Sequence, residues 1–380
     1  MRTATSAGRL LALLLALALV AGACTRESED GGTAEGEGEQ ASSQEDGGTL
    51  LDEVIERGTL RCGVNETVPG FGFDPGDGNI DGFDIDFCRA FAAALFNTSE
   101  NVDDLIELVP IDADNRFIAL QNGDYDVLVR NTTWTTSRDG AEGVAFLHPN
   151  FYDGQAMMVR KDEFSSIDEM DGTSICVTTG TTTELNLADY FGDRGLDFEA
   201  IAFEENPQIQ RAFISGRCDG WTSDRSQLAG LQSQFPQAEG GPGSLVILDD
   251  VMSKEPLAPG VLDTEIELHD ALDAVVNGLI LAEEYDITSE NIQQSVEDPG
   301  QGPVAALLGA PVLDPETGES APVENGLGIE DDFMVNVITA VGNYGEIFDR
   351  HIGPDSEIGL ERGVNALWTE GGIQYGIPFR

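Results

Sequence analysis

Short apolar runs alternate with amphipathic stretches along residues 50–260. The apolar runs have the length of strands and lie at 59–64, 106–110, 127–129, 174–177, 198–203 and 245–248. The amphipathic stretches have helical spacing and lie at 82–96, 116–122, 184–191 and 207–216, the first of them with Asp84 as its expected N-terminal cap. Strands that alternate with helices predict an α/β fold with a mainly parallel sheet.

Two extended segments divide this alternation. Residues 151–159 (FYDGQAMMV) and 253–260 (SKEPLAPG) are interpreted as crossovers between two lobes. We expect the first lobe to hold residues 50–153 and 258–380, and the second lobe to hold residues 154–257. Residues 266–284 and 330–351 have helical periodicity, which predicts a helical C-terminal extension of the first lobe.

The N-terminal segment has the features of a secretory signal peptide. Arg2 and Arg9 accompany an apolar core at residues 10–20 that is too short to span a bilayer as a mature helix. Small residues directly before Cys24 resemble a bacterial lipobox, in which residues 1–23 are removed and Cys24 is lipidated. Because Ala21 stands where a lipobox usually has Leu, a plain cleavage site with an unmodified cysteine is the alternative.

The following segment cannot form a core. Residues 25–48 are dense in Glu, Gly and Ser and contain no aliphatic residue larger than Ala, so we expect residues 24–49 to be a disordered acidic tether. A signal peptide, a lipid and a tether predict an exported protein anchored to the cell membrane, at the cell surface or in a periplasm. The formal net charge of −51 excludes nucleic acid as a partner and makes each fixed cation conspicuous.

Residues 124–139 (DYDVLVRNTTWTTSRD) combine a short strand with polar side chains. The strand is followed by hydroxyl and amide side chains and then by Arg138. Backbone N–H groups at such a strand end, together with a planar guanidinium that can donate two parallel hydrogen bonds, suit one small carboxylate ligand. Taken alone, the stretch would be interpreted first as a surface turn rich in Ser and Thr that carries a surface arginine.

A second stretch has the same design. Residues 174–177 predict a strand, residues 178–183 (TTGTTT) a hydroxyl-rich turn, and residues 184–191 a helix. Thr181 and Glu184 have the spacing of a capping box, which specifies the helix start. Two strand–turn–helix units therefore predict two lobes that each present polar groups to one ligand.

Four cysteines follow Cys24, namely Cys62, Cys88, Cys176 and Cys218. An even number in an exported chain predicts two disulfides, with three connectivities open; we prefer Cys62–Cys88 and Cys176–Cys218, which keep each bridge within one lobe. Since no C-x-x-C spacing occurs and the three histidines are far apart in sequence, we expect no metal site, and nothing in the sequence calls for a cofactor.

Six segments in chain order resemble the family 3 solute-binding proteins of polar amino acid ABC importers, and most of all their general L-amino acid-binding branch. The segments are GFDIDFCRAFAAALF, DYDVLVRNTTWTTSRD, FYDGQAMMVRK, TTGTTTELNLADYF, GRCDGWTSD and SKEPLAPGV. The resemblance covers roughly residues 50–380 and implies a type II periplasmic-binding-protein-like fold. In this fold two α/β lobes are joined by a two-stranded hinge and close over the ligand.

The resemblance implies roles for residues at matching positions. Arg138 would bind the α-carboxylate of an L-amino acid, helped by Thr133 and by backbone N–H groups near Thr181 and Thr182. Asp224 would bind the α-ammonium group; its alternative role is to cap the helix that begins at residue 225.

Further residues are expected around the ligand. Asn131 matches a position whose backbone carbonyl contacts the ammonium group, and Thr178 is expected at the edge of the second lobe. Arg130 would contact acidic or amide side chains of the ligand, or else pair with a surface aspartate. Phe71 and Trp134 are candidates for an apolar wall, although core packing is the alternative for Trp134.

The implied partners are an ABC permease and its ATPase in the membrane, with this chain as a monomer. The sequence contains no P-loop, so we do not expect it to hydrolyse nucleotide. The alternative is an exported cyclohexadienyl or arogenate dehydratase-like enzyme on the same fold, which would need a general acid in the cleft. No histidine occurs in either polar stretch, so we expect a binding protein rather than an enzyme.

Overall fold

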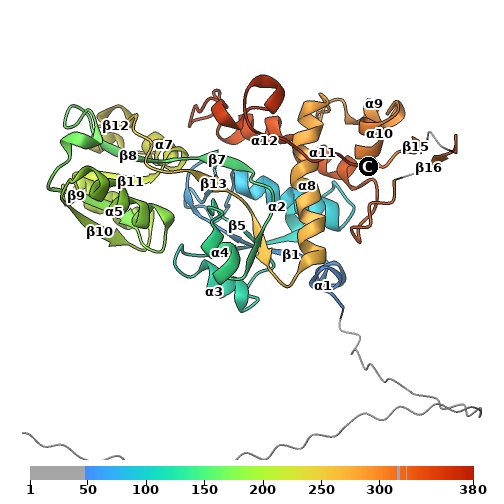
Figure 1. The fold of residues 1–380 in the computed structure, drawn as a ribbon, viewed down its shortest axis with the longest axis horizontal. Helices are drawn as coiled ribbons and strands as arrows, with labels where there is room; N and C mark the ends of the chain where they lie inside the picture. Colours follow the sequence, from blue (N-terminus) through green and yellow to red (C-terminus); the bar gives the residue numbers. More distant parts are fainter. Residues whose placement is uncertain (1–47, 315–316, 322) are drawn as a thin grey trace, which may run out of the picture. The chain divides into compact units, whose positions relative to one another are not determined.

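Two five-stranded sheets organise the part of the chain that the computed structural model describes, which comprises residues 48–314, 317–321 and 323–380 (Figure 1). The predicted signal peptide, Cys24 and nearly all of the predicted tether lie outside the described residues. The described chain begins at the end of that tether, where Thr49 caps helix α1 (Leu50–Arg57) in a capping box with Asp52.

The first sheet has the spatial order β4 (Ile106–Pro110), β1 (Leu60–Val64), β5 (Val127–Val129), β14 (Gly260–Leu262) and β6 (Val144–Phe146). Strand β1 runs parallel to β4 and β5, whereas β14 runs antiparallel to both of its neighbours. The helices that belong to this lobe include α2 (Phe83–Leu95), α3 (Arg116–Gln121), α4 (Thr136–Ala141), α8 (Ile266–Glu284), α11 (Phe333–Val341) and α12 (Tyr344–His351).

Apolar side chains bury both faces of the first sheet. The larger core cluster joins β1 and β5 to helices α2, α8, α11 and α12, and a smaller cluster around Tyr125 and Leu128 includes side chains of α3. Gly63 in β1 leaves room for the Tyr125 ring to pack on the second face, because a Cβ atom there would lie 2.6 Å from that ring. Strands β1 and β5 are therefore buried on both sides, as expected for α/β sheets.

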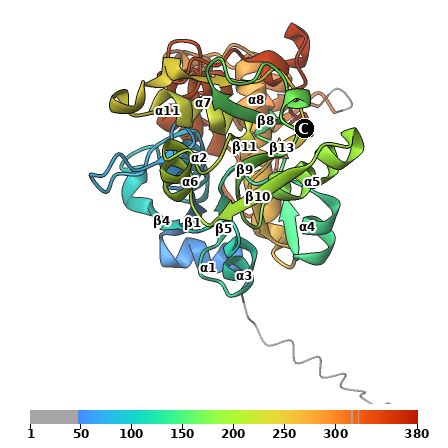
Figure 2. The same ribbon diagram turned by 90° about the vertical axis from the view of Figure 1, so that its left-hand side faces the viewer.

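The second sheet has the spatial order β10 (Phe198–Phe203), β9 (Thr173–Thr178), β11 (Gly220–Asp224), β8 (Gln155–Arg160) and β12 (Leu245–Ile247). Figure 2 shows its strands between α6 (Asn206–Ile214) on one side and α5 (Thr182–Arg194) on the other. Cluster residues of α6 and α7 (Arg225–Ser233) pack with Trp221, and Leu187 and Phe191 of α5 pack in a separate cluster.

Both sheets are built to one plan. In each sheet four strands share one direction, and the strand that arrives from the other lobe, β14 or β8, is inserted antiparallel before the last strand. The prediction of a mainly parallel α/β fold with two lobes is confirmed, with these inserted strands as the exception.

The two crossovers pair with each other. Strand β7 (Phe151–Asp153) and strand β13 (Glu255–Leu257) are antiparallel, with Asp153 opposite Glu255. The expected two-stranded hinge is thus present between the sheets. Because β7 and β13 separate the strands of one sheet from those of the other, we propose the predicted limits of the lobes, 50–153 with 258–380 and 154–257.

The remaining elements are short. They are β2 (Thr67–Val68), β3 (Gly72–Phe73), η1 (Val102–Leu105), η2 (Ile167–Glu169), η3 (Gln237–Glu239), η4 (Pro242–Ser244), α9 (Ile292–Glu297), α10 (Pro303–Leu307), β15 (Val312–Leu313), β16 (Ser320–Ala321), η5 (Gly363–Asn365) and η6 (Trp368–Glu370). Within the described ranges, no helix has the length and apolar character needed to cross a bilayer.

The C-terminal extension is bonded to the hinge. The side chain of Asn365 accepts a 2.7 Å hydrogen bond from the N–H of Tyr152 and donates a 2.9 Å bond to its carbonyl oxygen. The carbonyl oxygen of Asn150 accepts hydrogen bonds from the hydroxyl of Tyr344 (2.9 Å) and the amide of Gln374 (3.4 Å). The extension therefore supplies partners for backbone groups of the first crossover.

The cysteines differ from the prediction in one pair. Cys176 and Cys218 form the expected disulfide within the second sheet's core. Cys62 on β1 and Cys88 on α2 are free, buried thiols, so the predicted Cys62–Cys88 bridge is wrong. Burial and the neighbouring Cys62 thiol raise the pKa of Cys88 well above its usual value, which keeps Cys88 in its unreactive thiol form in the folded protein.

Candidate functional site

A polar cavity of about 270 Å³ lies between the two lobes. Its walls come from the ends of β1, β4 and β5 in the first lobe, and from β9, β11 and the start of α5 in the second. Of the residues predicted to bind ligand, those that line this cavity are Asn131, Thr133, Arg130, Arg138, Thr178, Thr181, Thr182 and Asp224. The structure thus brings both polar stretches of the sequence to one place.

Phe71 is the exception, and its expected place in an apolar wall is wrong. Its side chain is not part of the cavity lining and is buried in the core of the first lobe, with its ring edge against Phe83 and Phe151. Trp134 does not line the cavity either; it stacks on Phe146 and is partly exposed. For an aromatic residue in a loop, the sequence carries no signal that distinguishes a place in the cavity wall from burial in the core or partial exposure.

Arg138 is held with its guanidinium group in the cavity wall. Thr135 caps helix α4 by accepting a hydrogen bond from the N–H of Arg138, and Arg138 Nη1 donates a 2.8 Å bond to the carbonyl oxygen of Thr133. The side chain also lies over the ring of Phe117. Burial lowers the pKa of Arg138, and the carboxylates of Glu255 and Asp224 oppose that shift. The group is a fixed, partly desolvated cation with donors left for a ligand.

Asp224 stands opposite in the second lobe, at the end of β11. It precedes α7 but makes no side-chain cap to that helix, so the alternative capping role is not observed. Its Oδ1 atom is buried and has no hydrogen-bond partner among the described residues. Burial raises the pKa of Asp224 well above its usual value, and the carboxylates of Asp153 and Glu255 add to this shift. A buried acceptor in this setting needs a cation or a proton.

The second polar stretch forms the start of helix α5 as predicted. Thr181 is the N-terminal cap and accepts a hydrogen bond from the N–H of Glu184. The Glu184 side chain accepts from the N–H of Gly180 instead of completing a capping box. Thr178 Oγ1 is buried in the cavity wall and has no partner among the described residues.

Hydrogen bonds cross the cavity rim from one lobe to the other. Arg116 Nη2 donates to the carbonyl oxygen of Gly180 (3.3 Å), and the Asn131 amide donates to the Gln227 side chain (3.0 Å). Gly180 has a φ of +70°, and a Cβ atom there would lie 2.8 Å from the backbone of Asp114 in the first lobe. The lobes are therefore in contact, and glycine at this position allows it.

Two further arginines lie at the cavity. Arg130, which sequence analysis identified, donates from Nε to the carbonyl oxygen of Ile111 (2.7 Å), and burial lowers its pKa to about 10. Arg116, which sequence analysis missed, is buried, and its Nε atom has no partner among the described residues. Burial, and then the charges of Arg138 and Arg130, lower the pKa of Arg116. One feature of the sequence could have identified Arg116: it is one of few cations in the chain, and it directly follows a strand and a turn.

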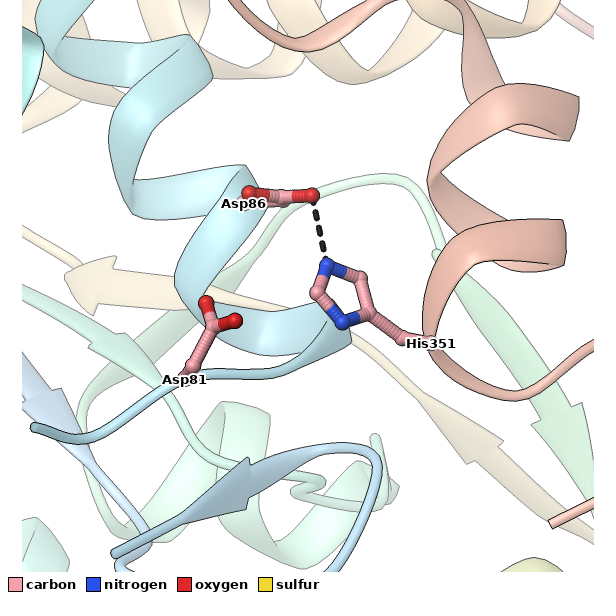
Figure 3. Close-up of side chains that lie close together, drawn as sticks. All are labelled: Asp81, Asp86 and His351. Atoms are coloured by element: carbon pink, nitrogen blue, oxygen red, sulfur yellow. Dashed lines mark hydrogen bonds and ion pairs between the residues drawn. The ribbon is translucent and has the colours of Figure 1, made fainter. Parts of the chain in front are cut away.

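A cluster of side chains that could coordinate a metal ion lies away from this cavity, between α2 and α12. Figure 3 shows the imidazole of His351 facing the carboxylate of Asp86, with Asp81 nearby. His351 Nε2 lies 2.6 Å from Asp86 Oδ2, Arg89 bonds both carboxylates at 2.7 and 2.8 Å, and Arg350 also bonds Asp86. A divalent cation would have to displace two guanidinium groups, so we interpret the cluster as an ion-pair network.

Comparison with known proteins identifies relatives of the whole described body. The model of the bacterial extracellular solute-binding proteins, family 3, matches residues 60–294. A general L-amino acid-binding periplasmic protein of Rhizobium johnstonii is 42% identical, over 87% of this chain and 93% of its own length. A glutamate/glutamine/aspartate/asparagine-binding protein of Rhodobacter capsulatus is 40% identical, over 87% of this chain and 94% of its own length.

A solved structure shares the architecture. It is a periplasmic binding protein of an ABC transporter from Brucella ovis, with glutathione bound. It is 40% identical, superposes with a TM-score of 0.80, and the match covers 88% of this chain and all of that one.

Proposed function

Because the chain belongs to the bacterial extracellular solute-binding proteins of family 3, we propose that it captures L-amino acids between its two lobes and delivers them to an ABC importer. One observation carries the proposal. A buried guanidinium in one lobe and a buried, unpartnered carboxylate in the other, Arg138 and Asp224, face one cavity without forming an ion pair among the described residues.

This arrangement matches the two charges of an amino acid. The α-carboxylate would bind Arg138 and the N–H groups at the start of α5, near Thr181 and Thr182, where a helix of ordinary length leaves donors unpaired. The α-ammonium group would bind Asp224. Since the two partners lie on different lobes, a ligand that binds both stabilises the closed form.

The side chain of the ligand would extend toward Arg116 and Arg130. Two buried cations, one with an unpartnered Nε atom, favour a carboxylate or amide over an aliphatic or cationic side chain. The name of the Rhodobacter capsulatus relative, which specifies glutamate, glutamine, aspartate and asparagine, supports this preference. We therefore propose Glu, Gln, Asp and Asn as preferred ligands within a broader set.

Membership of the family accounts for part of what we propose about the protein's location and partners. The protein acts outside the cytoplasm, as its periplasmic relatives do. We propose that a signal peptide of residues 1–23 directs export, that a lipid on Cys24 holds the protein at the membrane, and that the body acts as a monomer beside the permease. The relatives described above are named as binding proteins, which supports a binding role over the dehydratase-like alternative.

Calorimetric titration of the chain without its signal peptide, against each of the twenty L-amino acids, tests the proposal. We expect micromolar or tighter binding of acidic and amide amino acids, and a loss of at least about 100-fold in Arg138→Ala, because a buried charged partner is removed. Arg211→Ala, on the exposed side of α6, is the control and should bind normally. A folded, ligand-free protein that binds none of the twenty would contradict the proposal.

The side-chain preference has its own test. Arg116→Met keeps the length and apolar stem of the side chain but removes its charge. We expect the variant to lose affinity for L-glutamate by about 10-fold or more and to change little toward L-leucine or L-alanine. Equal losses for all ligands would show that Arg116 serves the fold of the cavity and not the choice of ligand.

A further inference from the structure

The carboxylate of Glu255 in hinge strand β13 accepts four side-chain hydrogen bonds. Its Oε2 atom accepts from Thr133 Oγ1 (2.6 Å) and Thr182 Oγ1 (2.8 Å). Its Oε1 atom accepts from Asn186 Nδ2 (2.8 Å) and from the hydroxyl of Ser253. Glu255 is only 1% exposed, so these donors replace water around a buried charge.

The donors come from separate parts of the fold. Thr133 follows β5 in the first lobe, Thr182 and Asn186 lie on α5 of the second lobe, and Ser253 precedes the hinge strand itself. The Thr133 and Thr182 hydroxyls are also within 3.3 Å of each other. One carboxylate thus joins both lobes at the hinge, in the arrangement in which the lobes are in contact.

Two of these hydroxyls line the ligand cavity. A threonine hydroxyl has a single proton, and that proton is used when the hydroxyl donates to a carboxylate. What Thr133 and Thr182 can then offer toward the cavity is oxygen lone pairs, which accept hydrogen bonds from a donor such as the ligand's ammonium group. In this arrangement the Thr133 hydroxyl does not donate to the ligand's carboxylate as the resemblance implied, and that group is left to Arg138 and the N–H groups of α5. Without Glu255 either hydroxyl could instead donate to the other, 3.3 Å away, or to the ligand, so its polarity toward the ligand would be unspecified.

We infer that Glu255 is a positioning residue for ligand binding, which orients the Thr133 and Thr182 hydroxyls as acceptors and links the two lobes through them. This inference rests on the proposed binding of amino acids in the cavity. Glu255 itself does not line the cavity, so it would act through the two threonines and not by contact with ligand.

Glu255→Gln is the direct test, because the amide keeps the shape but replaces one acceptor oxygen by an NH₂ group that faces donors. We expect calorimetry to show binding of L-glutamate weakened by about 10- to 100-fold, the effect of losing charge-assisted hydrogen bonds at a buried site. Glu283→Gln is the matched control. That carboxylate on α8 binds Arg362 at 2.8 Å and 3.0 Å, away from the cavity, and its loss should leave affinity unchanged.

A double-mutant cycle separates positioning from a general structural role. If Glu255 acts through the hydroxyls, Glu255→Gln should cost little further affinity in a protein that already carries Thr133→Val and Thr182→Val. Losses that simply add would overturn the inference, since a structural effect does not depend on those hydroxyls. Thr133→Ser, which keeps the hydroxyl, should recover affinity relative to Thr133→Val.

A second variant covers the case in which Glu255→Gln does not fold. Asn186 does not line the cavity, and Asn186→Leu removes one donor to Glu255 without touching a ligand contact. We expect binding weakened by about 3- to 10-fold, as for loss of one hydrogen bond; unchanged binding would overturn the inference. Wild-type protein that binds no amino acid would instead contradict the proposed function, so the two failures are distinct.

Discussion

The backbone N–H of Asn131 donates a 2.9 Å hydrogen bond to the carboxylate of Asp84, which lies in the first turn of helix α2. Asn131 has a φ of +31°, a conformation that asparagine tolerates better than most residues. The bond fixes the loop after β5 at the point where it enters the cavity wall. The geometry of the ligand site therefore depends on a helix residue that does not line it.

Asp84→Asn should change how stability depends on pH. Burial raises the pKa of Asp84 from 3.8 to about 7, although the bond from Asn131 and the charge of Arg130 oppose the shift. A raised carboxyl pKa means that the folded state binds the proton more tightly, so this residue's contribution is present below pH 3.8 and is lost as pH rises toward 7. The loss is on the order of 4 kcal/mol.

Asparagine keeps an acceptor but cannot ionise. Denaturant unfolding at several pH values between 4 and 7 should show wild-type stability falling relative to the variant as pH rises. Parallel curves for the two proteins would show that Asp84 does not titrate in this range.

Ligand binding should release a proton from Asp224. Burial and the neighbouring carboxylates raise its pKa in the absence of ligand, and an ammonium group favours the ionised form. Affinity should therefore fall as pH is lowered through that raised pKa. Titrations in buffers of different ionisation enthalpy measure the proton released, and Asp224→Asn should abolish the release and weaken binding by about 100-fold. Binding heats that are independent of buffer would contradict the assignment.

Gly180→Ala should hinder closure of the lobes. A Cβ atom at this position would lie 2.8 Å from Asp114 Cα and 2.9 Å from its Cβ, and φ is +70°. We expect ligand affinity to fall by about 10-fold or more, measured by calorimetry, because the closed form is strained. Gly172→Ala is a matched control with a φ of +74° and no atom within 4 Å of its Cβ. Equal effects of the two changes would attribute the loss to backbone strain alone.

The network around Asp86 should stabilise the fold without a metal. Its bonds to His351, Arg350 and Arg89 hold the pKa of Asp86 below its usual value despite burial, so its contribution is present above pH 3.8 and is lost as pH falls through the lowered pKa. Asp86→Asn should cost about 3 kcal/mol at neutral pH, measured by denaturant unfolding. Chelators and added Zn²⁺ or Ca²⁺ should leave the melting temperature unchanged; a metal-dependent rise would identify a cation site here.

Local patterns predicted the elements better than the contacts between them. The helix start at Thr181 followed from capping chemistry within four residues, and the crossover strands followed from their extended character. Asp84 was predicted to cap its own helix, but Gly82 occupies the cap position and Asp84 instead bonds Asn131, 47 residues later. Such a partner is set by the tertiary fold and has no signal at short range.

Some residues of the candidate site could be predicted from the sequence and others could not. Arg138 could be identified because it follows a strand and a polar turn and because the chain has few cations to place, whereas Asp224 was identified through the family resemblance. Arg116 was missed because its helix reads as ordinary amphipathic sequence, and Glu255 because it lies in a segment interpreted only as a hinge. The Cys62–Cys88 bridge was predicted from an even count of cysteines, and such a count does not determine whether a particular pair is bonded.

The hydrogen bonds from Asn365, Tyr344 and Gln374 to the first crossover bear on how far the chain can be shortened. The segment that matches the family model ends at residue 294, before all three residues. A chain cut there would leave the backbone groups of Tyr152 and the carbonyl oxygen of Asn150 without these protein partners, beside apolar surface that the extension now covers. We therefore expect a chain that ends with the recognisable family segment to be less stable than the full chain, and a version that extends to Gln374 to keep these bonds.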